Sequence, residues 1–139
     1  MTRNTAREIA THLAYELSFR RHERHWMEVD EEKEAYPVLS PDGKQEEYIR
    51  RLVSGVAEHA AELDADIEKY AKGWRFERIS LVASAIMRVA MYEMLYMADI
   101  PAGVAINEAV EIAKHYESPE VVKFINGILG SFARGELKE

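Results

Sequence analysis

The sequence predicts an all-α fold of about seven helices, arranged as two small and tightly joined bundles. Apolar residues recur at three- and four-residue intervals over most of the chain, as they do along amphipathic helices. Residues 81–97 are apolar on almost every side, which predicts a buried central helix. No segment shows a strand pattern. We therefore expect a single domain over residues 1–139, with sub-bundles over about 1–73 and 74–139 that meet near Gly73.

The first helix is expected over residues 3–19. Its apolar positions repeat with helical spacing at Ala6, Ile9, Ala10, Leu13, Ala14 and Leu17. Arg3 and Arg7 lie four residues apart and share a face, whereas Tyr15 lies beside the apolar stripe. Because a positive charge near a helix N-terminus opposes the helix dipole, a partner outside the helix is a reasonable explanation for both arginines.

Residues 20–45 have no clear helical pattern. A cationic cluster at residues 20–25 is followed by an acidic run at 28–34 and then by turn residues. The cluster includes Arg20 and Arg21, and it fits either a solvated helix end or a patch that faces phosphates. We expect a long loop here, which holds a short helix around residues 31–35.

Residues 45–72 keep helical phase, either as one long helix or as two helices with a break near Ala60 and Ala61. Gly55 lies inside this segment and lowers its helix propensity, which indicates that another helix packs closely against it. Gly73 is expected to end the segment, and a short helical turn should follow at residues 76–80.

The central helix carries two charges in an otherwise apolar sequence. Arg88 and Glu93 are five residues apart, so they are poorly placed to pair with each other. A buried charge without a partner is expensive, and each side chain should therefore find a partner on a neighbouring helix.

Two further helices are expected at residues 100–116 and 118–132. Asp99 is predicted to cap the first and Ser118 the second, with a proline in each first turn. The apolar side of the first helix is predicted to comprise Val104, Ala105, Ile106, Ala109, Val110, Ala113 and Tyr116. The second helix has its apolar seam at Val121, Phe124, Ile125, Ile128, Leu129 and Phe132, with Lys123 outside it.

Composition excludes several classes of site. The chain has no cysteine, which rules out disulfides and thiolate chemistry and fits a reducing cytoplasm. No apolar run is long enough to span a membrane. Phosphate-binding and dinucleotide-binding glycine motifs are missing, and His22 and His25 lack the further ligands that a metal site needs. We therefore expect no enzyme, no cofactor and no metal.

Binding to single-stranded RNA requires cations for phosphates and exposed aromatic rings for unstacked bases. The candidates in this sequence are Arg3, Arg7, Tyr15, Lys123 and Phe124. Tyr15 also fits packing at the edge of the core, and the periodicity alone places Phe124 in the core. The net charge of −7 means that any contact with RNA must come from a local patch, and it also suits a basic protein partner.

The C-terminal part of the chain reads INEAVEIAK, a Ser-Pro turn and KFINGIL. These motifs are similar to the C-terminal signature of the NusB family of bacterial transcription antitermination factors. The likeness extends to RVAMYE at residues 88–93, and to Ala6-Arg7-Glu8 and Tyr15 at the N-terminus. The family's N-terminal arginine cluster is thinned here to Arg3 and Arg7.

The resemblance implies a two-part helical domain that binds the boxA element of ribosomal RNA transcripts. It further implies the ribosomal protein NusE as a partner and RNA polymerase antitermination complexes as the setting. By the same resemblance, Arg7, Tyr15, Lys123 and Phe124 become the leading RNA contacts.

Two alternatives remain open at the level of sequence. The chain fits a protein-interaction module that self-associates as a homodimer and binds RNA weakly. NusB-like domains also resemble the N-terminal part of certain ribosomal RNA methyltransferases, which implies an accessory domain of such an enzyme.

Overall fold

A computed structural model describes residues 2–17, 44–73 and 78–137. These residues form six α-helices and no strand, which confirms the predicted all-α fold. The expected loop over residues 20–45 lies almost wholly outside the described residues, as do its short helix and the cluster with Arg20 and Arg21. Of the turn expected at residues 76–80, only residues 78–80 are described. None of the described helices is both long enough and apolar enough to cross a membrane.

The described helices keep the order of their labels along the chain. Their bounds are α1 Arg3–Leu17, α3 Lys44–Glu58, α4 Ala60–Tyr70, α5 Leu81–Tyr96, α6 Ala102–Tyr116 and α7 Pro119–Glu136.

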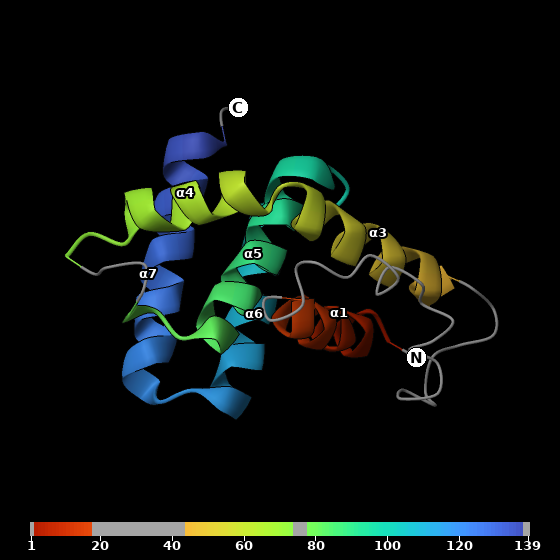
Figure 1. Cartoon of the computed structure of the whole chain (residues 1–139), viewed down its shortest axis with the longest axis horizontal. Coiled ribbons are helices and arrows are strands. Elements are labelled where there is room, and N and C mark those ends of the chain that lie inside the picture. Colours follow the sequence, from red (N-terminus) through yellow and green to blue (C-terminus); the bar gives the residue numbers. More distant parts are fainter. Residues whose placement is uncertain (1, 18–43, 74–77, 138–139) are drawn as a thin grey trace.

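Helix α5 forms the centre of the molecule and packs against all five of the other described helices (Figure 1). Twelve consecutive residues, Ala83 to Met94, are buried, which confirms the prediction of a central helix with apolar sides all round. The helices that surround α5 come from both sides of Gly73 in the sequence. The division into sub-bundles at residue 73 stays a prediction.

Of the two alternatives for residues 45–72, the structure has two helices with a break, because α3 ends at Glu58 and α4 begins at Ala60. Gly55, near the end of α3, lies directly against the ring of Tyr92 on α5, and there is no room for a Cβ atom between them. This contact confirms the prediction of close helix packing at Gly55. Gly73 has a φ of 84°, a left-handed conformation that glycine adopts without strain.

Ser118 caps α7 as predicted, since its Oγ accepts a hydrogen bond from the backbone N–H of Val121 at 3.3 Å. The prediction that Asp99 caps α6 is wrong. Pro101 holds the N-cap position in an extended conformation, and no side chain caps this helix. Asp99 therefore lies two residues before the cap, too early in the chain to reach the first free N–H groups.

The apolar side of α6 is rotated relative to the prediction. Ala105, Ala109, Ile112 and Ala113 are the buried positions. Val104 and Tyr116, which were assigned to the apolar side, are each 45% exposed. Periodicity alone could not place them, because both lie at the edge of the buried stripe.

The contact at Gly55 leads to a prediction about stability. Gly55→Ala should lower the free energy of unfolding by about 1–3 kcal/mol, because the added methyl group must displace the ring of Tyr92. Gly127→Ala is the matched control in the middle of α7, where an added Cβ meets nothing. It should raise the free energy of unfolding by about 0.5–1 kcal/mol. Urea unfolding measures both, and a stabilising Gly55→Ala would contradict the packing described.

Candidate nucleic-acid interface

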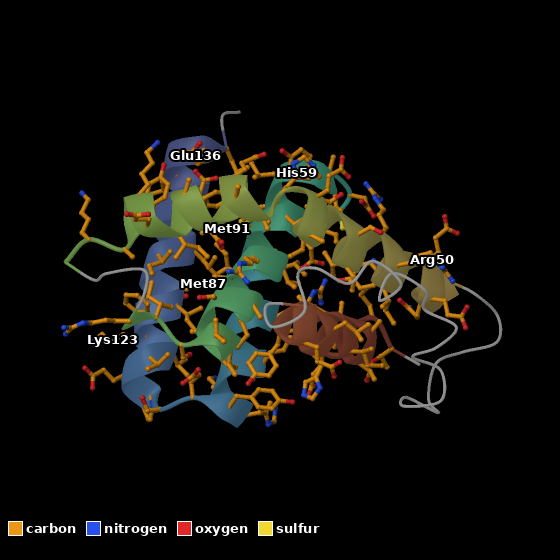
Figure 2. All side chains as sticks on the ribbon, viewed as in Figure 1. Arg50, His59, Met87, Met91, Lys123 and Glu136 are labelled. Atoms are coloured by element: carbon orange, nitrogen blue, oxygen red, sulfur yellow. The ribbon has the colours of Figure 1, made fainter. Side chains whose placement is uncertain are left out.

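The five predicted RNA contacts fall into two separate regions. Arg3 and Arg7 lie in the first turns of α1, next to α3 and α5. Tyr15 and Lys123 instead line two hollows that both involve the end of α6. Figure 2 shows Lys123 on the α7 side of the molecule, far from Arg50 on α3. The structure therefore does not bring the five residues together into one patch.

Arg7 is buried, and its guanidinium group binds the carboxylate of Glu93 on α5. Arg7 Nε lies 2.9 Å from Glu93 Oε1, and Nη2 lies 3.0 Å from Oε2. The remaining nitrogen, Nη1, donates to Asn4 Oδ1 at 3.0 Å. With only 2% of Arg7 exposed, this geometry gives the residue a structural role. A contact between Arg7 and RNA stays a prediction.

Tyr48 on α3 completes this buried cluster by donating its hydroxyl proton to Glu93 Oε2 at 2.6 Å. Burial, followed by the negative charge and the hydrogen bond of Glu93, raises the pKa of the Tyr48 hydroxyl far above its ordinary value. For Arg7, burial alone would lower the pKa, but the hydrogen bond and charge of Glu93 outweigh burial and raise it. Both donors therefore keep their protons at neutral pH.

Arg3 lies outside the buried cluster and covers it. Its Cζ atom is 4.0 Å from the centre of the Tyr48 ring, and its Nε donates to Gln45 Oε1 at 3.0 Å. The side chain is exposed, so the cation–π contact leaves much of the guanidinium group open to solvent. Arg3 can therefore still meet a phosphate.

Tyr15 lines a small pocket between α1, α5 and α6, which we call the Tyr15 pocket. Its volume is about 170 Å³, and its walls include Glu8, Thr11, His12, Tyr15, Val82 and Tyr116. Tyr15 is half-buried and packs against the core, while Tyr116 forms an exposed wall. The Tyr116 hydroxyl donates to Glu8 Oε2 at 2.8 Å and thereby links α6 to α1.

Lys123 lines an open groove between α6 and α7, with a volume of about 500 Å³. Lys114, Glu117, Val122 and Asn126 also line this groove. Lys114 forms an exposed ion pair with Glu111 at 2.7 Å. The groove thus carries two lysines and mixed polar groups, which suits contact with a phosphate backbone.

Phe124 is half-buried and packs against the hydrophobic core. It follows Val122 by two residues, so it lies on the opposite flank of α7 from the groove. The sequence allows Phe124 to be either a core residue or an RNA contact. In the structure its side chain is only partly buried, so it is neither fully in the core nor fully on the surface.

The structure also identifies residues that the sequence analysis missed. These are Glu8, Thr11 and His12, which lie on the same face of α1 as the predicted Tyr15, since Thr11 and His12 are three or four residues from both Glu8 and Tyr15. That spacing was a usable signal, but Tyr116 comes from a distant helix and only the fold brings it to this face. Among the described residues, no group of three or more histidines and carboxylates could hold a metal ion.

The chain resembles known proteins over most of its length. The model of the NusB family matches residues 4–134. The chain is 44% identical to the transcription antitermination protein NusB of Acetivibrio thermocellus, over 99% of this chain and 92% of that one. Such proteins are transcription factors, which confirms the prediction that the chain is not an enzyme.

Solved structures show the same fold. NusB of T. maritima superposes with a TM-score of 0.85 at 34% identity, covering 99% of this chain and 94% of that one. A crystal structure of the antitermination factors NusB and NusE in complex with dsRNA gives a TM-score of 0.80 at 25% identity. It covers 96% of this chain and 98% of the matched chain.

The buried ion pair predicts that replacing Arg7 lowers the free energy of unfolding far more than replacing the exposed Lys114 does. Arg7→Ala should lower the free energy of unfolding by about 3–5 kcal/mol, because it leaves Glu93 charged and buried without its main partner. Lys114→Ala removes an exposed pair and should cost less than about 1 kcal/mol. Urea unfolding at neutral pH compares the two. Equal and small losses would contradict a structural role for Arg7.

The raised pKa of the Tyr48 hydroxyl predicts how the stability of the protein changes with pH. Its pKa is raised by folding, so its stabilising contribution is complete below the unfolded pKa of about 10 and is lost as the pH rises above that value. Tyr48→Phe should therefore cost about 1.5–3 kcal/mol near pH 8 and less near pH 11.

Unfolding of both proteins by urea across this range is the measurement. Tyr70, Tyr96 and Tyr116, whose hydroxyls also bind carboxylates, are present in both proteins and cancel in the difference. A difference that stays constant with pH would contradict the buried hydrogen bond to Glu93.

Proposed function

The chain belongs to the NusB family, and we propose that it acts as an RNA-binding transcription antitermination factor. In this proposal it binds boxA-type single-stranded RNA of ribosomal RNA transcripts together with the ribosomal protein NusE. The assembly joins RNA polymerase and makes it resist termination. This role places the protein in the bacterial cytoplasm, where transcription takes place.

The observation that carries the proposal is the match over nearly the whole chain to a NusB that was crystallised with both NusE and RNA. The fold of the present chain matches that relative with a TM-score of 0.80. The chain also presents a half-buried aromatic ring at Tyr15 and an exposed lysine at Lys123. Cations and stacking rings are what unstacked RNA requires.

We assign the RNA contacts to Arg3, Tyr15, Lys123 and Phe124, with Arg7 in a positioning role. Arg7 holds the start of α1 against α5 and thereby fixes the helix that carries Tyr15. The exposed cations among these contacts, Arg3 and Lys123, can neutralise only a few phosphates. The logarithm of the affinity falls by about 0.7 per neutralised phosphate for each tenfold rise in salt concentration. With few neutralised phosphates, the affinity should therefore depend only weakly on salt.

The acidic surface of the chain supports a composite mechanism. With a net charge of −7, the protein attracts a basic partner and repels RNA over most of its surface. NusE would dock on the acidic surface and add its own contacts to the RNA. RNA would then bind more tightly to the pair than to either protein alone.

One observation favours a second candidate function, a protein-interaction module that forms homodimers and binds RNA weakly. Arg7, one of the two N-terminal arginines, is occupied by Glu93 and is not free to meet phosphates. The alternative of a methyltransferase accessory domain gains no support, because the chain aligns with transcription antitermination proteins NusB over about nine-tenths of their length.

The proposed contacts on α7 predict the effect of two substitutions on RNA affinity. Lys123→Ala should weaken binding of boxA RNA a few-fold, and its effect should shrink as salt is raised, because it removes one phosphate contact. Phe124→Ala should weaken binding by about 1–3 kcal/mol if the ring stacks on a base. Fluorescence anisotropy with labelled boxA RNA, with and without NusE, measures both.

Lys72→Ala is the control, since it removes an exposed lysine after α4 and should leave RNA affinity unchanged. Thermal melting of each variant separates a lost contact from a lost fold. The wild-type chain failing to bind boxA RNA both alone and with NusE would rule out the proposed function. Sedimentation at several concentrations would then test the homodimer.

A further inference from the structure

The Tyr15 pocket has the size of one six-membered aromatic ring. Its volume is about 170 Å³, and a cavity of about 150 Å³ in a protein core is large enough to hold benzene. A pyrimidine base is a single six-membered ring, whereas a purine has two fused rings. The pocket therefore has room for a single ring such as a pyrimidine.

The walls of the pocket have the chemistry that an unstacked base requires. Tyr15 and Tyr116 contribute aromatic rings from α1 and α6, and the ring of His12 lies 6.1 Å from that of Tyr116. Val82 adds an aliphatic wall from α5. Aromatic and apolar walls around a narrow hollow favour a flat ring that stacks or packs edge-on.

The hydroxyl protons of Thr11 and Tyr116 in the pocket are already used in hydrogen bonds. The Thr11 hydroxyl donates to the backbone carbonyl of Arg7 at 2.8 Å, so its proton is already used. The Tyr116 hydroxyl donates to Glu8 Oε2, and this hydrogen bond, followed by partial burial, raises the pKa of Tyr116. Tyr116 thus keeps its proton and holds the Glu8 carboxylate in place.

Glu8 is half-buried and lines the pocket, and one of its oxygens, Oε1, is not used by the Tyr116 hydroxyl. A carboxylate oxygen accepts hydrogen bonds but cannot donate one. Cytosine presents an exocyclic amino group as a donor, whereas uracil presents a carbonyl oxygen at the same position. Glu8 therefore attracts the edge of cytosine and repels that of uracil.

We propose that the Tyr15 pocket is a cytosine-binding subsite, in which Tyr15 and Tyr116 pack against the base and Glu8 accepts a hydrogen bond from its amino group. This inference rests on the proposed function, since it names the base that the RNA would place in the pocket. It adds Glu8 and Tyr116 as residues that determine specificity.

The experiment compares two labelled RNA oligonucleotides, an oligouridine and the same oligouridine with one central cytidine. Fluorescence anisotropy with the full chain measures the affinity of each. Wild type should prefer the cytidine-containing RNA by about tenfold, as expected for one hydrogen bond to a charged group. Glu8→Gln should bring the two affinities close together, because an amide can also donate to the carbonyl of uracil.

Glu62→Gln is the matched control. The Tyr96 hydroxyl binds Glu62 at 2.8 Å in the same way that Tyr116 binds Glu8, but that pair joins α5 to α4, away from the pocket. This variant should keep the full preference for cytidine. Tyr116→Phe is a second variant that keeps the ring and releases Glu8, and it should show a reduced preference. Thermal melting verifies that each variant is folded.

Each outcome bears on the inference. Loss of the preference in Glu8→Gln together with its retention in Glu62→Gln supports the subsite. Binding of both RNAs with equal affinity by wild type, or an unchanged preference in Glu8→Gln, overturns the subsite and leaves the proposed function standing. Binding of neither RNA by wild type overturns the subsite together with binding of RNA by the chain alone.

Discussion

The bond between Arg7 and Glu93 is the constraint on which the rest of the structure depends. It joins the first helix of the chain to the central helix α5, and Tyr48 adds α3 through the same carboxylate. An isolated buried charge would be costly, so the three side chains are stable only together. They therefore fix one arrangement of α1, α3 and α5, and this arrangement carries Tyr15 to the start of α5 and the end of α6.

This arrangement separates the chain into a structural end and an end that can bind. At the first, Arg7, Tyr48 and Glu93 neutralise one another inside the core, and exposed Arg3 adds a single outlying contact for a phosphate. At the second, aromatic rings and a lysine stay partly open around the end of α6. An acidic protein can bind RNA at such a site when its own contacts with RNA are few and a basic partner protein supplies the other contacts.

The sequence predicted most of the fold because helical periodicity and turn chemistry are local signals. The central helix, the break before Ala60 and the cap at Ser118 are all read from neighbouring residues. The candidate site was harder to predict, since burial depends on distant helices. Nothing near Arg7 in the sequence reveals that Glu93 will neutralise it, and Tyr116 reaches Glu8 only after α6 has packed on α1.

The most direct test of this account is a nuclear magnetic resonance titration of the isotopically labelled chain with boxA RNA. The account predicts that signals of Tyr15, Tyr116 and Lys123 shift, whereas the Arg7 Nε–H signal, held by Glu93, stays in place. A large shift of the Arg7 signal, with the signals at the end of α6 unchanged, would contradict it. RNA would then bind at the Arg7–Glu93 pair, to which we assign a structural role.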